Sequence, residues 1–74
     1  MAEVSVYPNP SQDKIYINNE IFSADYYIYD AKGTLINKGE YNDMNGIPVS
    51  SLETGQYIIR LKDRDKEWMG RFIK

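Results

Sequence analysis

Turn-forming residues interrupt this sequence about every eight to twelve positions, a rhythm typical of a β-sandwich or β-barrel. The segments between the turns are rich in Tyr, Ile and Val, and none has the spacing of an amphipathic helix. In the clearest segment, residues 57–62, Tyr57, Ile59 and Leu61 fall on one face. The pattern predicts seven strands, at residues 4–7, 14–18, 26–30, 34–38, 47–49, 57–62 and 67–74. We therefore expect an all-β fold, a seven-stranded antiparallel immunoglobulin-like β-sandwich.

The length of the chain leaves room for one domain. It has 74 residues, and a chain of this size buries only about 60% of the surface that it exposes when unfolded. We expect residues 1–74 to form a single domain with a thin core, in which Met1 and Ala2 are candidate cloning additions. The sequence has no Cys, so neither a disulfide framework nor a cysteine-based metal site supports the fold.

The charge pattern argues against nucleic acid and membrane partners. Nine Lys and Arg are scattered among eleven Asp and Glu, for a net charge of -2, whereas a nucleic-acid-binding domain carries a basic patch or stripe. No apolar stretch approaches the ~20 residues of a membrane-spanning helix. No signal peptide opens the sequence, so an exported protein would carry it on another segment. We expect no nucleic acid partner and no membrane-spanning segment.

The side chains that usually carry catalysis are scarce. The sequence has neither His nor Cys, which removes the commonest general base and the commonest neutral metal ligand. Asp63, Asp65 and Glu67 alternate along the chain, but Arg64 and Lys66 interrupt them and no glycine provides the turn of a calcium loop. That segment is better interpreted as a solvated hairpin turn. We predict no enzymatic activity, no cofactor and no metal site.

Two features have structural and functional interpretations side by side. Leu52, Gly55 and Tyr57 resemble the corner before a central sandwich strand, where a tyrosine hydroxyl bonds back to the preceding backbone. Alternation along the strands directs Tyr16, Tyr27 and Tyr29 outward, as a candidate exposed aromatic patch. Such a patch binds sugar rings or a protein partner. The alternative is ordinary cross-strand pairing on a small sheet.

Four blocks of sequence follow one another along the chain. They are residues 6–11 with 13–15, residues 28–36, residues 47–61, and the closing Arg-Phe-Ile-Lys of residues 71–74. Together these blocks resemble the type A C-terminal sorting domains of the type IX (Por) secretion system. The resemblance covers nearly the whole chain, and the combination of blocks is more specific than any one of them.

The resemblance implies a function in protein transport. Such a domain is a non-catalytic secretion signal at the end of an exported cargo protein. It directs the cargo through the periplasm and across the outer membrane, to the cell surface or the extracellular space, where a sortase normally removes it. The implied partners are the outer-membrane translocon, shuttle proteins and the sortase, and the implied fold is a seven-stranded immunoglobulin-like sandwich.

The resemblance also assigns roles to residues of this sequence. It implies a first turn at Pro8, Asn9 and Pro10, a middle hairpin at Asp30 and Gly33, a corner at Gly55 and Tyr57, and a terminal signal strand at Arg71, Phe72, Ile73 and Lys74.

We expect the terminal strand to lie at one edge of a sheet, with the basic ends of Arg71 and Lys74 available to a partner. The same edge is a candidate surface for a homodimer. The alternative function is an extracellular carbohydrate- or protein-binding module appended to an enzyme, which the outward tyrosines motivate. A purely structural spacer is a third interpretation.

Overall fold

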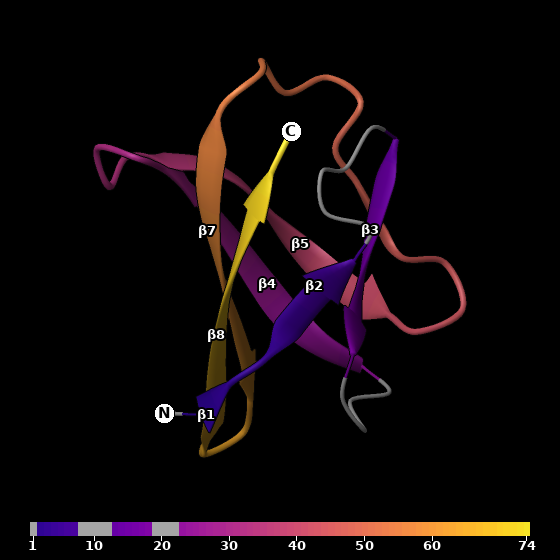
Figure 1. Cartoon of the computed structure of the whole chain (residues 1–74). Helices are drawn as coiled ribbons and strands as arrows, with labels where there is room; N and C mark the ends of the chain where they lie inside the picture. Colours follow the sequence, from indigo (N-terminus) through magenta and orange to yellow (C-terminus); the bar gives the residue numbers. More distant parts are fainter. Residues whose placement is uncertain (1, 8–12, 19–22) are drawn as a thin grey trace.

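Every regular element that the structure describes is a β-strand (Figure 1). The structure, a computed structural model, describes residues 2–7, 13–18 and 23–74. The strands in these ranges are β1 (Ala2–Glu3), β2 (Ser5–Tyr7), β3 (Lys14–Asn18), β4 (Ser23–Asp30), β5 (Leu35–Asn42), β6 (Ile47–Pro48), β7 (Gln56–Asp63) and β8 (Lys66–Ile73). The predicted all-β class is confirmed.

The strands form two sheets. The larger sheet has the order β1-β8-β7-β4-β5, and the smaller has the order β2-β3-β6. All neighbouring strands are antiparallel except β1 and β8, which pair in parallel through Ala2 with Trp68 and Glu3 with Met69. The prediction of two antiparallel sheets therefore holds apart from this short parallel pair.

An additional strand, β1, precedes the first predicted strand, residues 4–7, and belongs to the other sheet. β1 lies beside β8, whereas β2 pairs with β3, and Val4 stands between them. The Val4 amide donates to the carbonyl oxygen of Met69 at 2.9 Å, and the Val4 side chain is buried. The segment thus leaves one sheet and enters the other while its apolar side chains stay in the core, which a pattern of alternation cannot reveal.

The β4–β5 hairpin is longer than the sequence predicted. β4 begins at Ser23 rather than at Tyr26, and β5 continues to Asn42 rather than ending at Lys38. In this extension Ala24 lies opposite Tyr41, and both side chains are buried. Burial across the sandwich therefore extends a pair of segments whose own strand propensity is weak.

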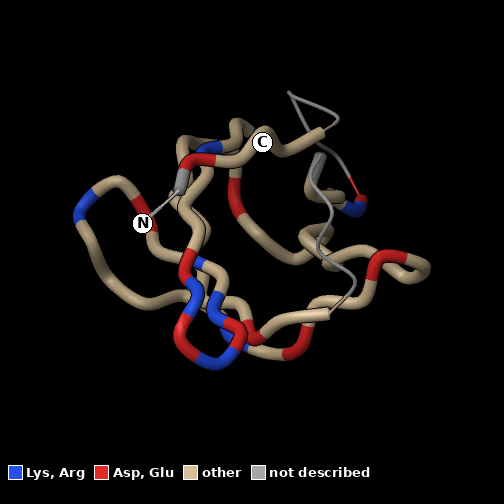
Figure 2. The backbone as a smooth tube through the Cα atoms, turned by 90° about the horizontal axis from the view of Figure 1, so that it is seen from below, with Lys and Arg blue, Asp and Glu red and all other residues tan. Residues whose placement is uncertain are grey.

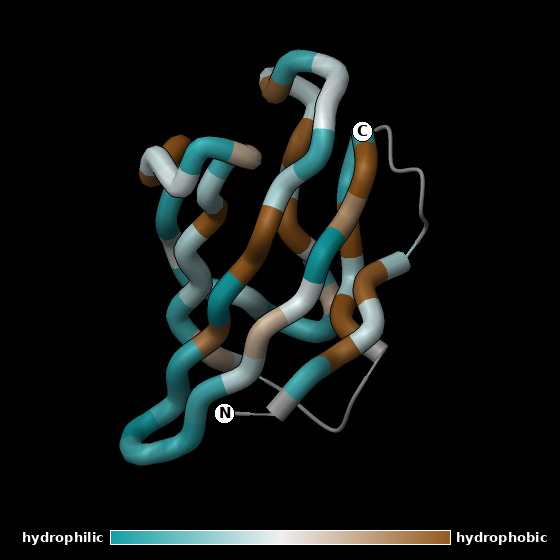
Figure 3. Tube along the Cα trace, turned by 60° about the vertical axis from the view of Figure 1, so that its left-hand side comes forward, coloured by the Kyte–Doolittle hydropathy of each residue, from teal (hydrophilic) through white to brown (hydrophobic). Residues whose placement is uncertain are grey.

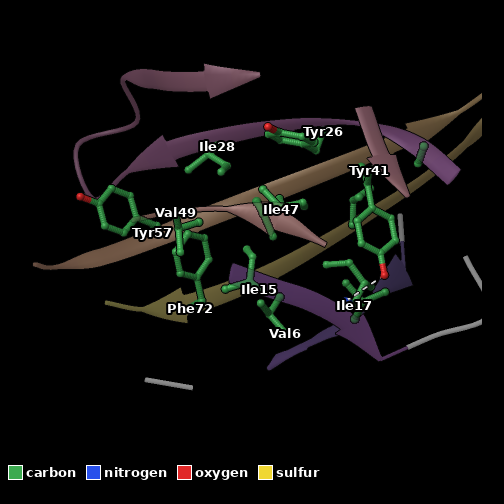
Figure 4. Close-up of a cluster of buried hydrophobic side chains, with 14 residues drawn as sticks. Val6, Ile15, Ile17, Tyr26, Ile28, Tyr41, Ile47, Val49, Tyr57 and Phe72 are labelled. Carbon is green, nitrogen blue, oxygen red and sulfur yellow. Dashed lines mark hydrogen bonds between the residues drawn. The ribbon is translucent and has the colours of Figure 1, made fainter. Parts of the chain in front are cut away.

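The core lies between the two sheets (Figure 4). Alternate residues of β2, β3, β4 and β7 point into it, as the period of two in a β-strand requires, and Figure 3 shows the corresponding alternation of hydropathy along the strands. Eight side chains are almost completely buried: Ile15, Ile28, Tyr41, Ile47, Val49, Ile59, Leu61 and Phe72. Full burial of one large aliphatic side chain stabilises a fold by about 1.5–3 kcal/mol.

A buried tyrosine joins the two sheets. Tyr41 extends from β5, and its phenolic oxygen accepts a hydrogen bond from the amide of Ile17 on β3 at 3.3 Å (Figure 4). Burial raises the pKa of the Tyr41 phenol, although the Ile17 hydrogen bond acts in the opposite direction. The hydroxyl therefore remains neutral in the fold and provides the Ile17 amide with an acceptor inside the sandwich.

Candidate recognition site around the C-terminal strand

The predicted signal strand corresponds to β8, which lies inside the larger sheet for much of its length. It pairs with β7 from Lys66 to Ile73, and β1 covers its other side at Trp68 and Met69. The expectation of an edge strand was therefore wrong for the first half of β8. The reason is that the beginning of the chain adds a parallel strand there, which closes an edge that would otherwise invite unwanted pairing.

The closing residues of β8 alternate between the core and the outer face. Phe72 is only 1% exposed and stacks on Tyr57, with ring centroids 5.3 Å apart, as Figure 4 shows. Arg71 is exposed, and Ile73 is 48% exposed. The four residues of the predicted signal strand are thus not equivalent, because Phe72 belongs to the core.

Lys74 is held by the loop that connects β6 to β7. Its ammonium group donates to the carbonyl oxygens of Ser50 at 2.7 Å and Leu52 at 2.6 Å. Its backbone exchanges two hydrogen bonds with Gly55, of 2.9 and 3.0 Å. The prediction of an available basic end was wrong for Lys74, because loop carbonyls outside the strand ladders accept hydrogen bonds from its ammonium group. These contacts tie down a chain segment of the kind that otherwise frays.

The corner before β7 has the hydrogen bond that the sequence predicted. The Tyr57 hydroxyl donates to the carbonyl oxygen of Glu53 at 2.6 Å, four residues back. Leu52 packs partly buried against the core, and its amide donates to the Val49 carbonyl at 3.0 Å. Gly55 has a φ of 159°, a value that residues with a side chain rarely adopt, although a Cβ built there would have no neighbour within 4 Å. The corner therefore connects the β6–β7 loop both to the core and to Lys74.

The β4–β5 turn is fixed by Asp30. One carboxylate oxygen accepts hydrogen bonds from the amides of Lys32 and Thr34, each at 2.9 Å. The Gly33 amide donates to the Asp30 carbonyl at 3.0 Å, and Gly33 has a φ of 88°, a left-handed conformation that suits glycine. The carboxylate is thus engaged in its own turn. Pro8, Asn9 and Pro10, for which a first turn was predicted, lie outside the described residues.

The predicted tyrosine patch is divided between the two sides of the sandwich. Tyr27 and Tyr29 lie on β4 of the larger sheet, on either side of buried Ile28, and are half-buried. Tyr16 lies on β3 of the smaller sheet, between buried Ile15 and Ile17. Period-two alternation reports whether a side chain points outward but not which sheet carries it, so the interpretation of one patch was wrong.

Sequence analysis missed the aromatic neighbour of Tyr16. Tyr7 on β2 pairs with Tyr16 in the ladder, and their rings stack with centroids 5.8 Å apart. Tyr7 is 50% exposed. Tyr7 ends the first predicted strand, and Tyr16 lies in the second. Pairing these two strands as a hairpin could have predicted that the two tyrosines are cross-strand neighbours.

Two open grooves flank the hydrogen bonds between Gly55 and Lys74. The first, of about 420 Å³, lies on the outer face of β7 and β8, where Gln56, Ile58, Arg71 and Ile73 line it. The second, of about 410 Å³, follows the corner from Ser51 to Tyr57 and reaches the β4–β5 turn. The closing strand thus takes part in a surface that can contact another molecule.

The electrostatics of this surface depend on a few charges. Figure 2 shows positive and negative residues alternating around the β7–β8 turn. Arg60 on β7 forms an ion pair with Glu67 on β8, with N and O 3.8 Å apart. Among the described residues no carboxylate lies within 4 Å of the Arg71 guanidinium. Arg71 is therefore a cation without a counter-ion among the residues that the structure describes.

The metal-ligating side chains of the described residues are dispersed over the fold. In the described ranges no group of three or more His, Cys, Asp and Glu lies together as a metal site would require. The described part of the chain offers no helix capable of spanning a membrane. Burial raises the pKa of the Tyr26 and Tyr41 phenols, but both side chains belong to the core and neither lines the grooves described above.

Comparison with known proteins places nearly the whole chain in one family. Residues 5–74 match the family described as the secretion system C-terminal sorting domain. A search of curated proteins and a search of solved structures each found no match. The matched range runs from the start of β2 to Lys74, so it includes Arg71, the corner at Tyr57 and the turn at Asp30.

Proposed function

Because the chain belongs to the secretion system C-terminal sorting domain family, whose members are sorting signals of the type IX secretion system, we propose that it acts by being recognised and catalyses no reaction. Such a signal implies export across the outer membrane, toward the cell surface or the extracellular space. The match over residues 5–74 is the observation that carries the proposal. In this proposal the cargo passes through the periplasm, and a surface sortase then removes the domain.

The partners in this proposal are the outer-membrane translocon, shuttle proteins and the sortase. The recognised part of the closing strand is its outward side, which Arg71 and Ile73 form. Two contacts support this division of roles: Phe72 stacks on Tyr57 in the core, and the Lys74 ammonium is held by loop carbonyls.

We also propose that the sandwich is immunoglobulin-like. The strand order supports this: the first segment of the chain contributes to both sheets, and β4, β7 and β8 are neighbours in the larger sheet. The Tyr57 hydroxyl bond to the Glu53 carbonyl gives further support, because a tyrosine corner of this kind is a hallmark of such sandwiches.

A carbohydrate-binding module, the alternative function, has no supporting observation. Tyr27 and Tyr29 lie on one sheet and Tyr16 on the other, so they form no common platform for a sugar ring. A homodimer through an edge strand remains a proposal. β5 is the outer strand of the larger sheet and would provide that edge, although the central Lys38 opposes the pairing of two like strands.

The export role is tested by a fusion in a cell that has the type IX system. A reporter protein with a signal peptide carries this chain at its C-terminus, and protease accessibility on intact cells measures its surface exposure. We expect surface exposure in the competent cell and retention in the same cell without the exporter. Equal exposure in both cells would contradict the proposal.

Point variants separate recognition from folding. Deleting residues 71–74 would remove Phe72 and the Lys74 contacts, so it would unfold the domain as well as remove a signal. Arg71→Ala leaves these contacts intact and is expected to reduce surface exposure. The matched control is Lys62→Ala, which removes one positive charge from an exposed position on β7. This variant should export normally.

A further inference from the structure

The groove of about 420 Å³ lies where β7 begins and β8 ends. The register places Ile58 opposite Arg71 and Gln56 opposite Ile73, and all four side chains point away from the core. Ala31, in the β4–β5 turn, closes one end of the groove. Tyr57 and Phe72 also border it, but their rings point inward and stack on each other. The groove is therefore a feature of the outer face.

Polar and apolar groups contribute about equally to the lining of this groove, which has one cation. Ala31, Ile58 and Ile73 provide apolar surface, and the outward polar side chains are Gln56 and Arg71. The residues that pair with β8 on either side of Ile58 are Tyr57 and Ile59, and the next outward positions of β7 are Gln56 and Arg60. None of these carries a negative charge, so nothing in the immediate ladder neutralises Arg71.

This arrangement differs from the rest of the same face. Arg60 forms an ion pair with Glu67, and Lys62 lies opposite Glu67 in the ladder. The chain as a whole has a net charge of -2. Arg71 instead has no acidic residue opposite it in the ladder, and it lies beside apolar surface on a domain whose net charge is negative.

The apolar floor continues beyond the groove onto β4. Ile58 pairs with Tyr29, and Tyr29 is half-buried on the same outer face. A ligand that contacts Arg71 can therefore extend across Ile58 and the Tyr29 ring. The surface suits a chain of several residues better than a single small ion.

We propose that this groove binds an extended acidic peptide segment of a partner protein, with Arg71 pairing a Glu or Asp carboxylate and Ile58 and Tyr29 contacting its apolar side chains. An arginine fork matches a carboxylate in two parallel hydrogen bonds. A saccharide would need more hydrogen-bonding side chains than the two that this groove offers. The proposal names the partner class for the surface invoked in the export role, and it depends on that role only for its biological meaning.

The test is a titration of the isotopically labelled domain followed by NMR. The probe is the peptide acetyl-Leu-Glu-Phe-Glu-Leu-amide, and its control is acetyl-Leu-Gln-Phe-Gln-Leu-amide. We expect the glutamate peptide to shift the amide signals of residues 56–58 and 71–73, and to bind about tenfold more tightly than the glutamine peptide. The difference should shrink as salt is added.

Variants assign the effect to Arg71. Arg71→Gln should reduce the affinity for the glutamate peptide about tenfold and leave the glutamine peptide unaffected. Arg71→Lys should fall between, because an ammonium keeps the charge but loses the fork. Lys62→Gln removes one positive charge from an outward position on β7, the strand beside β8. This variant should bind like the unchanged domain. The unperturbed signals of core residues verify that each variant is folded.

Each of the other outcomes would overturn the proposal. These are no shift with the glutamate peptide at its solubility limit, equal affinity for the two peptides, the same shifts with an oligogalacturonate instead, or shifts that depend only on the concentration of the domain and indicate a second copy. The titration needs no exporter. A negative titration with normal export of the fusion would reject the acidic-peptide inference and leave the export role standing.

Discussion

Lys74 and Gly55 exchange two backbone hydrogen bonds, of 2.9 and 3.0 Å, just beyond the last ladder pair of β7 and β8. This exchange prolongs the antiparallel pairing by one residue beyond Ile73. It also brings the Lys74 ammonium over the β6–β7 loop, where two carbonyl oxygens accept hydrogen bonds from it. Lys74 thus stabilises the corner from which the central strand begins, and its ammonium group is engaged in doing so.

We predict that Lys74→Met will destabilise the domain by about 1–2 kcal/mol, because it keeps the apolar stem but removes the donors to Ser50 and Leu52. Thermal or urea unfolding measures the change. Hydrogen exchange at the Gly55 amide, which donates to the Lys74 carbonyl, should accelerate as well.

The matched control for this variant is Lys62→Met, whose exposed ammonium has no carboxylate within 4 Å in the described ranges. It should leave both measurements almost unchanged. Equal stability of the Lys74 and Lys62 variants would show that water replaces the loop carbonyls at no cost, and would contradict the stabilising role of this contact.

Neighbouring residues of β8 should respond very differently to truncation. Phe72→Ala is expected to cost about 3–5 kcal/mol, because it empties a buried site beneath Tyr57. Ile73→Ala should cost less than about 1 kcal/mol, because that side chain is half exposed. Denaturant midpoints of the two variants, with the slope of the transition checked for constancy, decide the matter. Similar losses would mean that the two faces of β8 are not as distinct as the structure indicates.

Sequence alternation predicted the side-chain faces of the longer strands well. Tyr57, Ile59 and Leu61 point into the core as expected, because a strand of this length has only two faces and one must be apolar. The same reasoning could not assign strands to sheets. That is why Tyr16 was grouped with Tyr27. The pairing of β1 with β8 was not predicted either.

The candidate site was less accessible to sequence analysis. The Asp30 turn and the Tyr57 corner are local, with partners within four residues, so their residue types alone indicated them. The contact of Lys74 with Ser50 spans 24 positions. It depends on how the β6–β7 loop returns to the end of β8, which no local pattern encodes. The family resemblance pointed to Lys74. We expected its ammonium group to be available to a partner, whereas it is bound to loop carbonyls.

Gly70 is required where β2 crosses β8. A Cβ built at this residue would lie 2.8 Å from a methyl carbon of Val6 and 3.0 Å from the Val4 carbonyl oxygen. We predict that Gly70→Ala destabilises the fold by about 1–3 kcal/mol, as overpacked core positions do. Unfolding in urea measures the loss.

A double variant tests whether crowding by Val6 is the cause. Val6→Ala removes the nearest methyl group, so Gly70→Ala should cost less in that background than in the unchanged domain. If both backgrounds lose the same free energy, the constraint comes from the Val4 backbone instead.

The two buried tyrosines predict a loss of stability at alkaline pH. Burial raises the pKa of both Tyr26 and Tyr41 above the usual value of 10.0. Their neutral forms are favoured in the fold, so this stabilisation is complete below about pH 10, where unfolded tyrosines are still protonated. It is lost as the pH rises through the higher folded values. Urea midpoints between about pH 8 and 11.5 should therefore decline most steeply at the upper end.

Replacement by phenylalanine separates the two tyrosines. Tyr26→Phe should change stability little at pH 7 and should flatten the alkaline decline, because it removes one group that must ionise on unfolding. Tyr41→Phe should also flatten the decline, but at a cost of about 1–3 kcal/mol at pH 7, because the buried Ile17 amide loses its acceptor. An unchanged alkaline slope in both variants would locate the pH sensitivity elsewhere in the chain. Equal stability of the two variants at pH 7 would mean that the Ile17 amide finds another acceptor when the Tyr41 hydroxyl is absent.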